Sequence, residues 1–238
     1  MTFSILARCP RTGRLGLGIT SYTVCVGLYA NGVRANVGAT MTQSSIRERN
    51  NGLVLNLLAM GHSGGQVLEL LKVDDPDWDY RQIGIVDRVG NVVAYSGPKG
   101  RATCVHRIGQ QYVALGNGIV SQAVTDAMAG AFERNPEAEL EERLLCALEA
   151  GRDAGGQRSD FPGKKAERSA AITVFSSHDY PDFDLRVDFH HAAVDELRRI
   201  HEDYKPYRAY YAERFGNRQK VMMAPEEFER QLKAKKAA

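Results

Sequence analysis

The sequence predicts an α+β protein built as a four-layer α-β-β-α sandwich, with two mainly antiparallel sheets between outer layers of helices. Strand-like segments come in pairs joined by short turns, as expected for antiparallel hairpins. Helical segments also come in pairs, and they fall between the groups of strands. Strands and helices therefore do not alternate singly, which argues against a doubly wound parallel sheet.

The first predicted element is a hairpin over residues 2–21, TFSILARCPRTGRLGLGITS. Apolar residues alternate on both sides of the stretch from Pro10 to Gly13, which has the composition of a tight turn. Residues 33–43 alternate again, and the strand predicted there ends in hydroxyl and amide side chains. Small polar residues at a strand end are suited to lining a cleft.

The periodicity then changes from strand-like to helical over residues 51–58 and 63–71. Gly61 stops the first of these helices, and Ser63 is placed to cap the second. We therefore expect a pair of stacked helices.

A second hairpin is predicted around the turn Arg88-Val89-Gly90, and it is followed by a further strand and a second helix pair. The tract Gly116-Asn117-Gly118 is expected to be a Gly-rich turn that leads into the first helix of this pair. The predicted strands cover residues 82–87, 91–96 and 111–115, and the predicted helices cover residues 120–134 and 136–150.

The last part of the body is predicted to contain two strands, over residues 169–176 and 184–189, and a helix over about residues 192–204. We expect one domain over residues 1–204. Residues 205–238 are expected to form a C-terminal arm with a terminal helix, and this arm packs on the body or on a second subunit. A homo-oligomer, most simply a dimer, is the expected assembly.

The composition is that of an ordinary globular protein, with 43% hydrophobic and 25% charged residues and a formal net charge of +2. These values give no reason to expect a nucleic-acid or membrane partner. No charged leader with an apolar run opens the sequence and no run of eighteen apolar residues occurs, so neither secretion nor membrane spanning is expected. The four cysteines share no metal-ligand spacing. We predict reduced thiols, a cytoplasmic location, no metal and no cofactor.

Thr2 is the candidate for nucleophilic chemistry. An initiator methionine is usually removed when a small residue follows it, so we expect Thr2 to carry a free α-amine. An α-amine with an ordinary pKa of about 8 can accept the proton of the Thr2 hydroxyl near neutral pH, which would make one residue both nucleophile and base. The alternative is that Thr2 is an ordinary first residue of a strand, and a retained Met1 would favour this alternative.

With these segments in view, the chain resembles a bacterial family called domain of unknown function 1028. The segments that carry the resemblance are TFSILARCPRTGRLGLGITS, VGATMTQ, YRQIGIVDRVGNVVAYSG, HRIGQQYVALGN and DLRVDFH, spread from residue 2 to about 205. That family is similar to the N-terminal nucleophile (Ntn) hydrolases, whose fold is an α-β-β-α sandwich. The resemblance implies that Thr2 is the nucleophile and that Ser21 orients its amine. It also implies that backbone N–H groups or an Asn, for which Asn117 is the candidate, stabilise the oxyanion.

Further residues are candidates for substrate binding, and each has a structural alternative. Thr42 and Gln43 end a predicted strand, but β propensity alone also favours threonine there. His106 lies in a Gly-flanked segment and is equally well explained as a surface histidine. Arg168 belongs to a loop with Arg158, Lys164 and Lys165, and Ser169 begins the strand that follows. This loop either binds an anionic group or is a solvated run of charges.

The sequence thus supports an Ntn hydrolase-like protein that cleaves an amide-type C–N bond of a small molecule, with Thr2 as nucleophile after loss of Met1. A second hypothesis is a non-catalytic small-molecule-binding or oligomeric structural module on the same fold. A third and weaker hypothesis is anion or nucleotide binding at Gly116-Asn117-Gly118, where backbone N–H groups precede a predicted helix.

Overall fold

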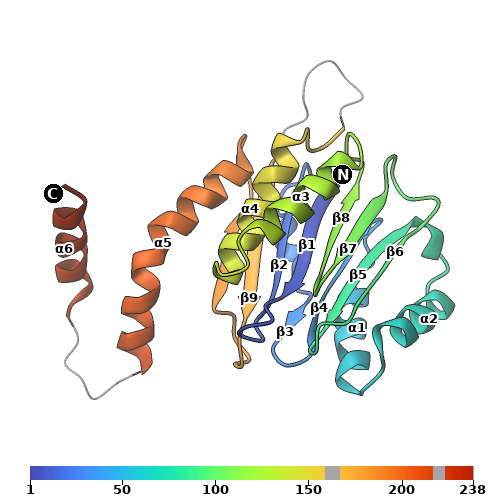
Figure 1. Cartoon of the computed structure of the whole chain (residues 1–238), viewed down its shortest axis with the longest axis horizontal. Coiled ribbons are helices and arrows are strands. Elements are labelled where there is room, and N and C mark those ends of the chain that lie inside the picture. The colour runs from blue at the N-terminus through green and yellow to red at the C-terminus, as the bar shows by residue number, and fades with distance from the viewer. Residues whose placement is uncertain (159–166, 217–222, 238) are drawn as a thin grey trace. The chain divides into compact units, whose positions relative to one another are not determined.

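The computed structural model describes residues 1–158, 167–216 and 223–237. The described residues form an α+β protein with two antiparallel sheets and six α-helices (Figure 1). The strands are β1 (Thr2–Arg8), β2 (Leu15–Ser21), β3 (Val33–Arg34), β4 (Gly38–Ser44), β5 (Arg81–Asp87), β6 (Val92–Ser96), β7 (Val105–Gly109), β8 (Tyr112–Asn117), β9 (Ser169–Phe175) and β10 (Phe183–Val187). The α-helices are α1 (Arg49–Ala59), α2 (Gly64–Asp74), α3 (Ala123–Arg134), α4 (Leu140–Asp153), α5 (Ala193–Gly216) and α6 (Pro225–Ala237).

The larger sheet has six strands in the order β10-β9-β2-β1-β8-β7, and the smaller has four in the order β3-β4-β5-β6. Neighbouring strands pair antiparallel throughout both sheets. The first strand of the chain, β1, is therefore an interior strand between β2 and β8. This position places Thr2 at one end of the middle of the larger sheet.

The predicted hairpin over residues 2–21 is confirmed as β1 and β2. Gly13 adopts φ +72° in the turn, a left-handed conformation that glycine adopts without steric cost. The side chains of Phe3 and Ser4 lie on opposite faces of β1. Phe3 lies under Gly151 of α4, whereas the Ser4 hydroxyl donates a hydrogen bond to Gln43 of the smaller sheet. Alternation along the strand therefore points Thr2 toward the smaller sheet as well.

The two sheets pack against one another through a common apolar core. Leu6, Leu17 and Leu115 of the larger sheet join Met41 and Val86 of the smaller sheet in one buried cluster. Gly84 allows the close approach, since a Cβ atom there would lie 2.8 Å from Leu6 Cδ1 and 2.9 Å from Leu115 Cδ1. Thr2, at the end of β1, therefore lies at the edge of a tightly packed core between the two sheets.

Helix pairs cover the outer faces of the two sheets (Figure 1). Helices α3 and α4 contact strands of the larger sheet, and α1 and α2 contact strands of the smaller one. The smaller pair buries Val54, Val67 and Leu71 against Ile83 and Ile85. The predicted cap of α2 is confirmed, because the Ser63 hydroxyl accepts the Gln66 N–H and the Gln66 side chain accepts the Ser63 N–H. None of the helices in the described residues has the combination of length and apolar character that a membrane span requires.

The chain divides into two compact units, Met1–Arg198 and Arg199–Ala238. In the second unit the aromatic rings of Tyr210 and Phe228 stack with their centroids 4.3 Å apart. The Tyr210 hydroxyl donates a hydrogen bond to the Met223 carbonyl at 2.8 Å. These contacts hold α6 against the later part of α5.

Several predicted boundaries were wrong. The strand expected over residues 33–43 is interrupted by a turn, where Asn36 adopts φ +58°. Strand β7 was not predicted, because its sequence mixes charged and apolar residues without alternation. Gly116 and Asn117 belong to β8 rather than to a turn, and α3 begins only at Ala123. The helix expected to end near Tyr204 continues to Gly216.

Candidate functional site

Four predicted site residues lie in one row across the larger sheet. Ser169 of β9 pairs with Ser21 of β2, Ser21 pairs with Thr2 of β1, and Thr2 pairs with Asn117 of β8. Directly paired residues of antiparallel strands place their side chains on the same face. The register therefore brings the three predicted catalytic residues, Thr2, Ser21 and Asn117, together with Ser169.

The Thr2 and Ser21 hydroxyl oxygens lie 3.1 Å apart. Ser21 Oγ also donates to the Met1 carbonyl oxygen at 2.8 Å and accepts the Thr23 N–H at 3.1 Å. Because a serine hydroxyl has one proton, which Ser21 gives to Met1, the Thr2 hydroxyl is the donor to Ser21. Met1 thus occupies the hydrogen-bonding position next to the candidate nucleophile.

A cavity of about 240 Å³ opens beside Thr2, between the ends of β1, β2 and β4. Its polar lining consists of Thr2, Ser21, Thr23, Gln43, Ser44 and Ser45, and Arg101 adds a cationic group. Ile19, Val26 and Met41 supply apolar lining. A mostly neutral cavity with several hydroxyl groups and an amide is suited to a small polar ligand.

Gln43 is held by a buried network that bridges the two sheets. Its carbonyl oxygen accepts from Ser4 at 2.8 Å, and its amide donates to Gln82 Oε1 at 2.8 Å. The Asn117 amide donates to the same Gln82 oxygen at 3.1 Å. Asn117 is fully buried, and its Oδ1 has no hydrogen-bond partner among the described residues. Asn117 is thus a neighbour of Thr2 in the sheet, with its amide directed to Gln82.

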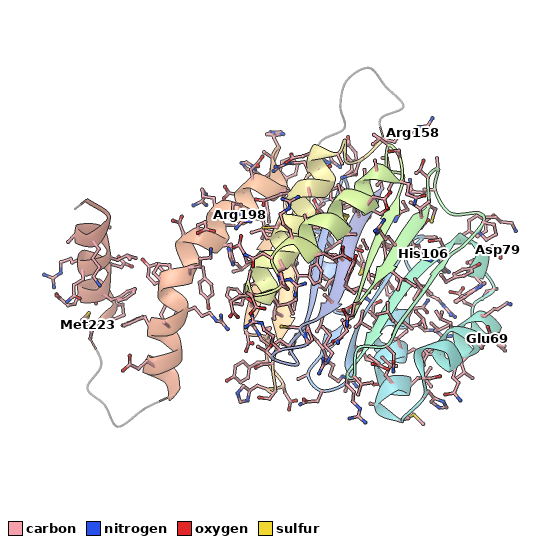
Figure 2. The ribbon with its side chains drawn as sticks, viewed as in Figure 1. Glu69, Asp79, His106, Arg158, Arg198 and Met223 are labelled. Atoms are coloured by element: carbon pink, nitrogen blue, oxygen red, sulfur yellow. The ribbon has the colours of Figure 1, made fainter. Side chains whose placement is uncertain are left out.

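His106 is linked to the same network at the edge of the sheets. It lies on β7 (Figure 2). Its Nδ1 is 2.9 Å from the hydroxyl of Ser96 on β6. Gln82 donates to Ser96 at 2.9 Å, so hydrogen bonds connect Gln43 in the cavity to His106. Burial lowers the pKa of His106 below its ordinary value, which favours the neutral ring.

Arg168 and Ser169 support the segment that forms one wall of the cavity. Arg168 Nε donates to the Tyr22 carbonyl at 2.7 Å, and its guanidinium carbon lies 3.9 Å from the centroid of the Tyr22 ring. Ser169 Oγ accepts the Val26 N–H at 3.1 Å and donates to the Thr23 carbonyl at 2.5 Å. Both contacts fix residues 22–26. Lys164 and Lys165 of the predicted basic loop lie outside the described residues.

Thr42 lines a neighbouring cavity of about 280 Å³. This cavity shares Tyr29 and Ile46 with the cavity at Thr2, so the two adjoin. Thr42 is only 2% exposed, and its hydroxyl has no hydrogen-bond partner among the described residues. Asn51 forms part of the same wall and accepts the Thr42 N–H at 2.9 Å. The second cavity thus offers a free hydroxyl at its floor.

Several lining residues of the first cavity were not singled out from the sequence. Ser44 and Ser45 follow Gln43 directly, and their polarity at a strand end was the available signal. Ser44 adopts φ +74°, which is uncommon for a residue other than glycine. Arg101 was noted only as a neighbour of His106, because the segment around it, GPKGRATC, is typical of a surface loop.

Comparison with known proteins identifies the family of the chain. The sequence profile described as "Family of unknown function (DUF1028)" matches residues 2–197. The chain is similar to protein SPO2555 from Silicibacter pomeroyi, a crystal structure assigned to DUF1028, with 25% identity and a TM-score of 0.78. That likeness covers 93% of this chain and 99% of the other.

A second solved structure, Anbu (ancestral beta-subunit) from Yersinia bercovieri, aligns over 84% of this chain and 93% of its own. It has 10% identity and a TM-score of 0.39, a level of likeness on which no conclusion rests. No curated protein matches the chain. The profile match over most of the sequence shows that the chain belongs to the DUF1028 family.

Proposed function

We propose that this protein is an Ntn hydrolase-like amidohydrolase that cleaves an amide-type C–N bond of a small molecule. In this proposal its two sheets and outer helix pairs form the four-layer α-β-β-α sandwich of that superfamily. The packing of α3 and α4 on the larger sheet, of α1 and α2 on the smaller, and of the sheets on each other supports this fold. Thr2 is the nucleophile after Met1 has been removed.

The observation that carries the proposal is the contact of 3.1 Å between the Thr2 and Ser21 hydroxyls at the wall of an open cavity. A threonine hydroxyl is a weak nucleophile unless a base accepts its proton. Loss of Met1 would replace an amide nitrogen, which is not basic, by an α-amine in the same residue. It would also remove the carbonyl to which Ser21 donates, leaving Ser21 to bind the new amine.

The proposed reaction then follows from these groups. Thr2 Oγ1 attacks the amide carbonyl carbon while the α-amine takes the hydroxyl proton. The amine returns this proton to the leaving nitrogen, the C–N bond breaks, and an ester to Thr2 remains. Water hydrolyses the ester and regenerates the hydroxyl. Asn117 or backbone N–H groups near the cavity would stabilise the oxyanion, and Asn117 would have to turn from Gln82 to do so.

The other predicted binding residues have supporting roles in this proposal. Gln43 contacts the substrate from the cavity wall, and Arg168 and Ser169 hold the wall formed by residues 22–26. The neighbouring cavity at Thr42 receives the part of the substrate that extends beyond the reacting amide. His106 acts only indirectly, through the hydrogen bonds that orient Gln43.

The experiment is a turnover assay on a panel of small amides with protein that lacks Met1. Thr2→Ala should abolish release of the amine product, and Thr2→Ser should retain a measurable fraction of it. Thr23→Ala is the matched control, because it removes another hydroxyl from the same cavity. It should change kcat by less than about tenfold, which corresponds to 1.4 kcal/mol. Equal activity of Thr2→Ala and the wild type would reject the proposal.

A binding module is the second candidate, and one contact favours it. With Met1 in place, Ser21 is already bonded to the Met1 carbonyl and the cavity is still open. A small polar ligand would then bind without being cleaved. In that case Thr2→Ala should leave the stabilisation of the protein by its ligand unchanged, and no amide should be turned over.

A further inference from the structure

The cavity at Thr2 has a single charged side chain in its described lining, apart from the α-amine of the chain itself. Among the described residues that line it, Arg101 is the only one with a charged side chain, and no carboxylate is present. The remaining polar groups are hydroxyls and the amide of Gln43. The cavity therefore presents a net positive field to a ligand, with nothing in its lining to repel an anion.

The Arg101 guanidinium has no ion pair and no side-chain hydrogen bond among the described residues. Lys99, two residues earlier in the same loop, is paired with Asp79 at 3.2 Å. Arg101 is exposed, and other exposed arginines of the unit have partners, such as Arg49 with Asp74 and Arg107 with Asp126. Arg101 is thus a cation that lines the cavity, and none of the described residues supplies an anionic partner for it.

The backbone of Arg101 is nevertheless fixed to the cavity wall. Its N–H donates to the Ser44 hydroxyl at 3.1 Å, and Ser44 itself lines the cavity. Ser44 adopts φ +74° at the end of β4, a conformation that is costly for serine and is maintained by its surroundings. The loop is therefore tied to the strand end that faces Thr2, and Arg101 lines the cavity from this loop.

We propose that Arg101 binds a carboxylate of the substrate, so that the preferred substrates are small amides that also carry an acid group. The planar guanidinium matches a carboxylate with two parallel hydrogen bonds. The cavity of about 240 Å³ has room for the reacting amide and a nearby acid group, and the adjoining cavity at Thr42 can take any longer part of the substrate. This inference rests on the proposed function only for the place of the amide at Thr2.

The test uses matched pairs of probes that differ only in charge: the monoamides of succinic, glutaric and adipic acid, and the diamides of the same acids. Binding is measured by calorimetry on the full chain carrying Thr2→Ala, so that no probe is consumed. At least one monoamide should bind about fivefold tighter than its diamide or more, as expected for a charge-assisted pair at a partly exposed site. The three chain lengths allow for the unknown spacing between amide and acid.

Arg101→Gln should reduce that preference to about one, with an unchanged melting temperature. Arg88→Gln is the matched control, because Arg88 is also exposed, on the β5–β6 turn, and does not line the cavity. It should leave the preference intact. Raising the salt concentration should weaken monoamide binding in the control but have little effect in Arg101→Gln.

Three results would overturn the inference: monoamides and diamides binding equally, no binding of any monoamide, or the same loss in both arginine variants. Its failure is distinguishable from failure of the proposed function. Cleavage of neutral amides that requires Thr2 but is indifferent to Arg101 would reject the inference alone. Monoamide binding that requires Arg101, with no amide cleaved by the wild type lacking Met1, would reject the hydrolase and leave an acid-binding site.

Discussion

Thr2 and Ser21 face one another across the β1–β2 pair, with their hydroxyl oxygens 3.1 Å apart and with Ser21 bonded to the Met1 carbonyl at 2.8 Å. In this chain of hydrogen bonds Thr2 donates to Ser21, and Ser21 donates to the Met1 carbonyl. The chain therefore ends at a carbonyl oxygen, which is not a base at neutral pH. In the proposed mechanism, removal of Met1 changes this order because the α-amine of Thr2 becomes the strongest base nearby.

Ser21→Ala should lower kcat of the protein that lacks Met1 by roughly 100-fold, since the amine and hydroxyl of Thr2 lose the group that orients them. KM should change little, because the cavity keeps its shape. Ser21→Thr keeps a hydroxyl and should restore most of the loss. Steady-state kinetics of the two variants check this, and equal defects in both would show that the hydroxyl is not required.

Ser169→Ala should raise KM more than it lowers kcat. The Ser169 hydroxyl holds the Thr23 carbonyl and the Val26 N–H, and both of these residues line the cavity. Leaving these buried groups without partners should also cost about 1–3 kcal/mol of unfolding free energy. Ser176→Ala, just beyond the other end of β9, is the control and should leave KM unchanged. A fall in kcat alone would contradict the supporting role of Ser169.

Gln82→Leu should destabilise the protein by about 3 kcal/mol or more, because it leaves the amides of Gln43 and Asn117 without an acceptor in a buried site. For a chain of this size, such a loss lowers the melting temperature by roughly 6–12 °C. Gln110→Leu changes an exposed glutamine and should stay within about 0.5 kcal/mol of the wild type. Calorimetric melting of both variants tests this, and similar curves would mean that the inter-sheet network is not needed for stability.

His106 should make the stability of the fold depend on pH. Burial lowers the pKa of His106 below its ordinary value of 6.5, so the folded protein binds the proton more weakly than the unfolded chain does. Its contribution is therefore complete above about pH 6.5 and is lost as the pH falls through the lowered folded pKa. Urea unfolding between pH 7 and pH 5 should show a shallower decline for His106→Asn than for the wild type. Parallel declines would refute this assignment.

Much of the fold was predictable because local signals agreed with the tertiary structure. The alternation over residues 2–21 and the cap at Ser63 both depend on short-range chemistry, and both predicted elements are present. Strand β7 lacks such a signal, because edge residues such as Arg107 and Ile108 are both exposed. Its pairing with β8 is decided by the sheet rather than by its own sequence.

The candidate site was predictable where it follows from the ends of strands, as for Thr2 and Ser21. The Gly116-Asn117-Gly118 tract has the composition of a turn, yet Asn117 pairs with Thr2 as a strand residue because β1 provides a long-range partner. The contact of Gln82 with Gln43 and Asn117 depends on how two sheets pack, which no local pattern encodes. The same holds for Arg101, which reaches the cavity through a loop tied to Ser44.

Two samples that differ only at Met1 show most directly whether Thr2 acts as the nucleophile. Both are released from the same cleavable fusion partner, one beginning at Met1 and the other at Thr2, and each is incubated with the amide panel. We predict that only the sample beginning at Thr2 releases amine and that mass spectrometry locates the acyl group on Thr2. Equal turnover by both samples, an acyl group on another residue, or no turnover by the sample beginning at Thr2 would contradict it.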